Sequence, residues 1–123
     1  MLDAVATFPR ENRLLNPAQY RAVFSHPVKT TDNCFTVLCR PSGQATPRLG
    51  LAVAKKNSRL AVDRNRIKRI VRESFRNNKE TLGGIDYVVL SRTGANCASN
   101  NELFASLERH WVKLRKKSAK QST

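Results

Sequence analysis

A row of cations between residues 64 and 76 could bind the phosphates of a polyanion. Its members are Arg64, Arg66, Lys68, Arg69, Arg72 and Arg76. Apolar or small residues recur between them at helical spacing, namely Ile67, Ile70, Val71, Ser74 and Phe75. This spacing predicts an amphipathic helix over residues 61–76 that packs one side on a core and turns the cations outward.

The alternative interpretation of this segment is an ordinary solvated helix face. Such a face usually carries acids that pair with the bases three or four positions away. Only Asp63 and Glu73 are available here, so most of the cations repel one another unless a polyanion neutralises them. The pattern therefore favours nucleic-acid binding, with the two acids as charge partners of neighbouring arginines.

The whole chain has the same bias. Its 123 residues contain 23 Lys+Arg and 9 Asp+Glu, a formal net charge of +14. Residues 48–76 contain ten cations and two anions, a net +8. This excess suits a phosphate backbone, whose affinity for cations comes largely from released counterions. The competing partner is an anionic membrane, but no stretch approaches the roughly 18 apolar residues of a spanning helix. The N-terminal residues do not resemble a signal peptide, so a cytoplasmic location is expected.

Other kinds of chemistry have little support. Cys34, Cys39 and Cys97 include no Cys-x-x-Cys pair, and His26 and His110 have no companions at ligand spacing. A metal site is therefore not expected. The acids are scattered, with no cluster of His and carboxylate that could act as an acid–base pair. We accordingly predict no catalytic residue in this chain.

The elements that position the cations can be read as one α+β domain. Asn16-Pro17 predicts a helix start, and that helix should end near Ser25 because His26 precedes proline. Ser99-x-x-Glu102 predicts the capping box of a last helix. Strands are predicted at 35–40, 48–54 and 87–90. Two terminal segments are predicted to lie outside the packed domain, an irregular arm at 1–12 and a disordered basic tail at 115–123.

One motif has a family resemblance. Arg64-Asn65-Arg66-Ile67-Lys68-Arg69, after a strand that ends Ala54-Lys55-Lys56, resembles the protein component of bacterial ribonuclease P, and the resemblance extends from Phe8 to about Leu114. It implies an α-β-β-β-α-β-α two-layer sandwich, with a third short strand that the pattern does not show. It also implies a left-handed βαβ crossover, against the usual right-handed rule.

The resemblance also implies a function. In this family the protein is an accessory subunit of an endonuclease whose catalyst is RNA, and the holoenzyme removes the 5′ leader of precursor tRNA. Mg²⁺ would be held mainly by the RNA, with none intrinsic to the chain, and no obligate protein partner is expected. The residues implied to bind the catalytic RNA are Arg64, Asn65, Arg66, Lys68, Arg69 and Arg72. Those implied to bind the leader are Tyr20, Phe24, Phe35, Lys55, Lys56 and Arg92.

Two questions stay open at the level of sequence. Tyr20 and Phe24 are spaced as a buried helix face would be, so they could belong to a core instead of a leader-binding cleft. A ribosomal protein or an RNA chaperone would have a similar charge and fold class, and is the alternative function. A DNA-binding regulator is less favoured, because no helix-turn-helix pair is visible.

Overall fold

A computed structural model describes residues 13–14, 17–25, 27–42 and 46–122, the last five by their backbone. Its helices and strands are α2 (Pro17–Ser25), β1 (Val28–Thr31), β2 (Phe35–Pro41), β3 (Arg48–Ala52), α3 (Ala61–Asn77), β4 (Ile85–Ser91) and α4 (Asn100–Ser122). Two short 3-10 helices, η2 (Lys79–Thr81) and η3 (Thr93–Asn96), flank β4. The predicted α+β class is confirmed. The predicted arm at 1–12 and the cap at Asn16 lie outside the described residues.

The four strands form one mixed sheet in the order β1-β2-β4-β3. β1 pairs antiparallel with β2, and β2 pairs antiparallel with β4. β3 and β4 are parallel neighbours, so α3 is the crossover between them. This confirms the βαβ unit that the family resemblance implies, and its left-handed sense stays a prediction.

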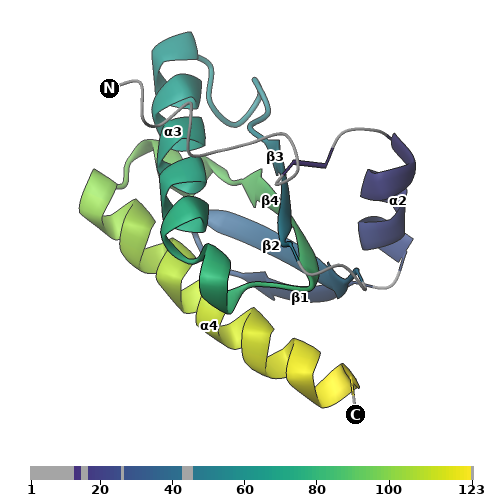
Figure 1. Ribbon diagram of the computed structural model, residues 1–123. Helices are drawn as coiled ribbons and strands as arrows, with labels where there is room; N and C mark the ends of the chain where they lie inside the picture. The colour runs from purple at the N-terminus through teal and green to yellow at the C-terminus, as the bar shows by residue number, and fades with distance from the viewer. Residues whose placement is uncertain (1–12, 15–16, 26, 43–45, 123) are drawn as a thin grey trace.

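One face of the sheet is covered by α3 and α4, which lie side by side against it (Figure 1). Paired residues of neighbouring strands point to the same face, and the row Val28, Cys39, Tyr87 and Leu49 belongs to this core. Three rings of the core meet edge to face with centroids 5.2–6.3 Å apart, namely Phe75, Tyr87 and Trp111. This packing holds α3 in a fixed orientation on the sheet.

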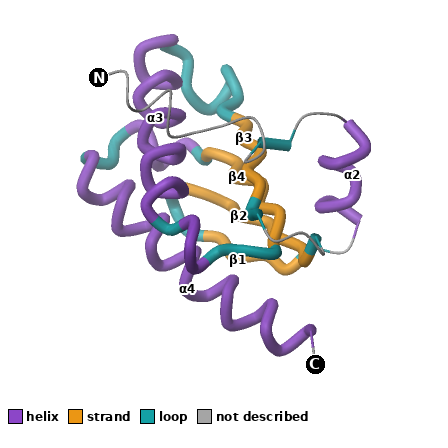
Figure 2. Tube along the Cα trace, in the orientation of Figure 1, coloured by secondary structure: helices purple, strands orange, loops and turns teal. Residues whose placement is uncertain are grey.

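The short helix α2 lies on the opposite face (Figure 2). Its Val23 is buried against Leu38 of β2 and Val88 of β4, and Leu14 joins this second, smaller cluster. The predicted two-layer sandwich therefore describes the sheet with α3 and α4, and α2 adds a partial third layer.

The last helix is longer than predicted. Ser99 and Glu102 form the expected capping box, with amide-to-side-chain hydrogen bonds of 2.7 and 3.1 Å. The disordered tail predicted from residue 115 is wrong, because α4 continues to Ser122. Leu114 is fully buried and anchors the helix just before this segment. The segment is mainly Lys, Arg, Ala and Gln, which have good helix propensity, and its cations suit the negative end of the helix dipole.

None of the helices in the part of the chain that the structure describes is long and apolar enough to cross a membrane.

Candidate nucleic-acid interface

The helix α3 has the two-sided character predicted for it. Ile67, Ile70, Val71, Ser74 and Phe75 are all buried. The side away from the sheet carries Asn65, Arg69 and Arg72, which are exposed, and Lys68, which is half-buried. Glu73 forms an ion pair with Arg76 at 2.5 Å, as predicted for this acid. The helix thus presents free arginines outward from a rigid support.

The side chain of Arg66, predicted to bind RNA, makes most of its contacts with the protein itself. Its guanidinium is half-buried and donates to Asn100 Oδ1 at 2.8 Å. It also points at the carbonyls of Ala95, Asn96 and Ala98, at 3.3–3.5 Å. These acceptors belong to the end of η3, the loop after it and the first residue of α4, so Arg66 ties α3 to that segment. RNA binding by Arg66 stays a prediction, but much of its hydrogen-bonding capacity is used within the protein.

Arg64 is also engaged with the protein backbone. Its Nη1 donates to the carbonyls of Ser58 and Arg59, both at 2.9 Å. These carbonyls belong to the loop between β3 and α3. Arg64 therefore fixes that loop while remaining only half-buried.

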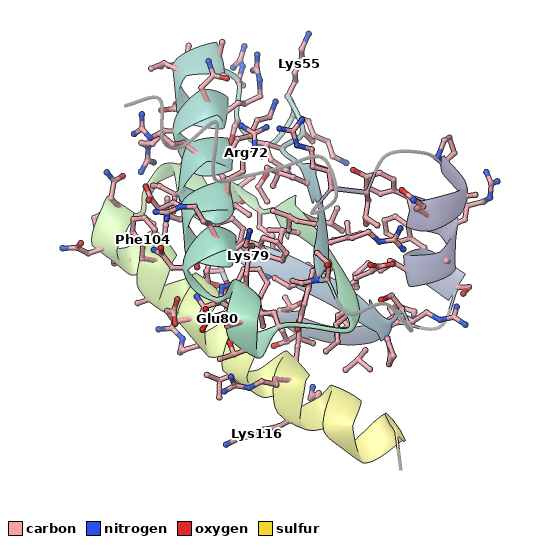
Figure 3. The ribbon with its side chains drawn as sticks, viewed as in Figure 1. Lys55, Arg72, Lys79, Glu80, Phe104 and Lys116 are labelled. Atoms are coloured by element: carbon pink, nitrogen blue, oxygen red, sulfur yellow. The ribbon has the colours of Figure 1, made fainter. Side chains whose placement is uncertain are left out.

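The predicted substrate cations gather at one edge of the sheet. Lys55 and Lys56 follow β3, and Arg92 follows β4. Because β3 and β4 are parallel, both strands end at the same edge. All three side chains are exposed, as is Arg59 in the same loop. We call Lys55, Lys56, Arg59 and Arg92 the edge surface. It lies where α3 begins, and Figure 3 shows Lys55 there and Lys116 at the far end of α4.

Two asparagines and a serine that the sequence did not single out hold this edge together. Asn57 Nδ2 donates to the Ser91 carbonyl at 3.0 Å, and Asn96 Nδ2 donates to the Asn57 carbonyl. The buried Ser58 donates from its Oγ to Asn96 Oδ1 at 2.5 Å. These hydrogen bonds therefore connect the loop that carries Lys55 and Lys56 to the end of β4 and to η3. Side-chain amides in a short loop after a strand are a weak signal of such a network.

The aromatic residues predicted for the leader separate into two groups. Tyr20 and Phe24 lie on α2, where Phe24 is 47% exposed and Tyr20 is half-buried with its ring over Gly50. Phe35 is fully buried in the core under α3 and α4. The prediction that Phe35 contacts the leader is therefore contradicted. In β2 the alternation places Phe35 on the opposite face from α2, and Thr36 and Leu38 on the same face as that helix.

The helices that the structure describes leave part of the sheet face beside α2 exposed. The strand register aligns Thr31, Thr36, Leu90 and Ala52 across the four strands. Of these, Thr31 and Ala52 are exposed and the other two are half-buried. We call this row the open strip. It is the row nearest the ends of β3 and β4, so it leads toward the edge surface.

Arg40 holds α2 beside this strip. It projects from β2, and its Nη1 donates to the Ala22 carbonyl at 2.8 Å and to Ser25 Oγ at 2.5 Å. Ala22 and Ser25 are in the last turn of α2, where carbonyls have no partner within the helix. The arginine thus fixes the end of the helix that carries Phe24.

The carboxylates near these surfaces have structural partners. Asp86 is buried and accepts two hydrogen bonds from Arg48, at 2.6 and 2.8 Å. Asp32 accepts from the amides of Cys34 and Phe35 and, at 2.5 Å, from the Ser106 hydroxyl. Within the described residues no group of three His, Cys, Asp or Glu side chains could hold a metal ion.

Asp32 also orders the edge surface. Burial raises the pKa of its carboxyl, but the hydrogen bonds from Ser106, Phe35 and Cys34 and the nearby His110 outweigh burial and lower the pKa to about 2. The carboxylate is therefore charged at neutral pH and pins the turn before β2 to α4. The carbonyl of the same residue accepts a hydrogen bond from Arg92 Nη1 at 2.7 Å.

A basic α+β domain with a cationic helix and a cationic sheet edge has the charge distribution of a nucleic-acid-binding protein. The model of the family described as Ribonuclease P matches residues 8–115. The ribonuclease P protein component of Methylococcus capsulatus is 48% identical over 116 residues, which cover 94% of this chain and 91% of the relative. That of Pseudoalteromonas atlantica is 46% identical, covering 93% and 95%. The chain belongs to the ribonuclease P protein family.

Solved structures agree with this assignment. A mutant RNase P protein of Staphylococcus aureus superposes with a TM-score of 0.81 at 27% identity, covering 94% of this chain and 98% of that one. The Thermotoga maritima RNase P protein, in complex with 1-(4-fluorophenyl)-2-thiourea, gives a TM-score of 0.73 at 30% identity, covering 80% and 96%. The fold described above is thus the fold of the family.

Proposed function

We propose that this chain binds the catalytic RNA of ribonuclease P and promotes removal of the 5′ leader from precursor tRNA. The observation that carries this proposal is the presence of exposed cations both on α3, at Arg69 and Arg72, and in the edge surface where that helix begins. Family membership favours this role over that of a ribosomal protein or an RNA chaperone, which charge and fold class alone had left open.

We assign the catalytic RNA to the outer side of α3, with Asn65, Lys68, Arg69 and Arg72 as contacts. These side chains are at least partly exposed, and the core beneath them fixes their spacing. Arg64 and Arg66 support the same surface from within, through their bonds to neighbouring loops.

We assign the leader to the open strip and to the rings of Tyr20 and Phe24. Unpaired bases stack on aromatic faces with little regard to sequence, which suits a protein that meets many different leaders. Leu90 and Ala52 provide apolar surface for the leader bases, and Thr31 and Thr36 provide hydroxyl groups that can form hydrogen bonds with them. The strip leads to Lys55, Lys56 and Arg92, which would meet the phosphates near the cleavage site.

Magnesium belongs to the RNA in this proposal. Several of the described carboxylates accept hydrogen bonds from protein donors, as in the pairing of Asp86 with Arg48, and no three His, Cys, Asp or Glu side chains of the described residues are grouped as a metal site would need. The chain contributes positive charge instead. Two polyanions repel each other, and a basic protein between them lowers the concentration of cations needed to screen that repulsion.

The proposal is tested by the salt dependence of binding to the catalytic RNA. The three cations assigned to this contact, Lys68, Arg69 and Arg72, predict a slope of log K against log salt of roughly −2 to −3. The double variant Arg69→Ala/Arg72→Ala should make this slope shallower by about one to two units with the fold intact. Lys113→Ala/Lys116→Ala removes the same charge from exposed positions on α4 and should leave the slope nearly unchanged. Equal slopes for wild type and the α3 variant would refute the assignment.

A further inference from the structure

Two large aliphatic side chains are exposed where α3 begins. Leu60 is 62% exposed and Val62 is 69% exposed. The other large hydrophobic residues exposed in the described part of the chain are Phe24 on α2 and Val112 on α4. Leu60 directly follows Arg59 and Val62 lies two residues further on, so this apolar pair borders the edge surface.

The leucine is in an unfavourable position for the folded protein. Leu60 is the N-cap residue of α3 and has no side-chain capping hydrogen bond. Only its backbone carbonyl contributes to the helix, by accepting hydrogen bonds from the amides of Asp63 and Arg64 at 3.1 Å each. Ser, Thr, Asp or Asn would cap the helix, and a leucine here is neither buried nor a cap. Natural proteins break such local rules mainly at functional or strained sites, and this turn borders the cations assigned to RNA.

The surrounding loop holds the pair in place. Arg64 bonds the carbonyls of Ser58 and Arg59 just before Leu60. Ser58 is itself buried and bonded to Asn96. The exposed aliphatic groups are therefore presented from an ordered turn, which lowers the entropy cost of binding.

We propose that Leu60 and Val62, at the start of α3, form an apolar contact with unpaired nucleobases of the catalytic RNA, beside the contacts assigned to the outer side of that helix. This inference rests on the proposed function. The flanking cations require an occupant that combines negative charge with apolar surface, and splayed-out bases on a phosphate backbone have both. A second copy of this chain, with a charge of +14, would be repelled.

The test is the double variant Leu60→Ser/Val62→Ser, with Val112→Ser as the matched control on α4. Affinity for the catalytic RNA should fall by about 5- to 30-fold at every salt concentration, because apolar burial is lost. The salt slope should stay that of wild type, because no phosphate contact is removed. The midpoint of thermal unfolding should rise by roughly 2–8 °C, because serine caps α3. The control should change neither affinity nor slope.

A folding defect would lower both the RNA affinity and the midpoint of thermal unfolding. Loss of this contact should lower the affinity and raise the midpoint, so the two cases can be told apart. Unchanged RNA affinity in the double variant, with wild type binding normally, would overturn the inference and leave the proposed function standing. So would a loss confined to vesicles of anionic lipid, or a change in oligomeric state measured by sedimentation. Failure of wild type to bind the catalytic RNA specifically would overturn the proposed function itself.

Discussion

The ring of Tyr20 lies directly over Gly50, so closely that a Cβ on Gly50 would come within 2.4 Å of ring atom Cε1. The contact joins α2 to the centre of β3, beside the open strip. Glycine is required here by the close approach of a side chain, since its backbone is not in the left-handed region. The pair therefore sets how the first helix sits on the sheet.

Gly50→Ala should displace the Tyr20 ring and weaken binding of precursor relative to mature tRNA. The clash involves the far end of a side chain that can rotate, so we expect a folded protein and a loss of about 1–2 kcal/mol in precursor preference. The double-mutant cycle with Tyr20→Ala should show coupling, because the methyl group then meets no ring. Strict additivity of the two changes would contradict the role of this contact.

Phe24→Ala distinguishes a binding residue from a core residue. Because the ring is 47% exposed, the free energy of unfolding should fall by only about 1 kcal/mol. Precursor binding should weaken by about 1–3 kcal/mol relative to mature tRNA. Phe75→Ala is the comparison, since that ring is fully buried and its loss should cost about 3–5 kcal/mol of stability. An unchanged precursor preference in Phe24→Ala would remove this residue from the leader site.

Arg66→Ala should act mainly on stability. Its guanidinium donates hydrogen bonds to the Ala98 carbonyl and to Asn100 Oδ1. Truncation leaves these acceptors unpaired and should lower the free energy of unfolding by about 1–3 kcal/mol. Arg66→Lys should not restore it, because an ammonium cannot reproduce the planar fork. Arg69→Ala, on the exposed side of the same helix, should change stability by no more than about 0.5 kcal/mol. Chemical denaturation of the three variants checks this, and equal stabilities would contradict it.

Asp32 predicts a specific acid sensitivity. Its folded pKa of about 2 lies below the ordinary value, so the stabilisation is fully present above about pH 5 and is lost as pH falls toward 2. Allowing for partial solvent screening, it should amount to about 1–2 kcal/mol. In Asp32→Asn the unfolding free energy should depend less on pH between 5 and 2. His110, 3.2 Å away, and Arg109, 3.6 Å away, remain in both proteins. Parallel pH profiles of the two proteins would contradict the assignment.

The sequence pattern was most informative where periodicity was strong. The spacing of Ile67, Ile70 and Phe75 correctly identified both the helix and its buried side, and Ser99-x-x-Glu102 located the start of α4. The four-residue strand β1 was missed because Val28–Thr31 is too short to establish an alternation.

Roles that depend on tertiary contacts were beyond sequence reasoning. Phe35 and Leu38 lie on opposite faces of β2, and which face α2 would cover was not readable from an aromatic residue alone. Arg66 and Arg72 look alike in a basic helix, yet only Arg66 meets carbonyls of η3 and of the loop after it, 29 to 32 positions away in the chain. Non-local pairing of this kind decides which cations remain available to RNA.

The central claim is that this chain supplies RNA contacts and charge, while catalysis resides in the RNA. The most direct measurement is cleavage of precursor tRNA by the catalytic RNA at low magnesium, with and without the protein, together with affinities for precursor and mature tRNA. We predict that the protein alone cleaves nothing, that with the RNA it lowers the magnesium requirement, and that it tightens precursor binding more than product binding. Specific 5′ cleavage by protein freed of RNA, or equal tightening of precursor and product, would contradict the account.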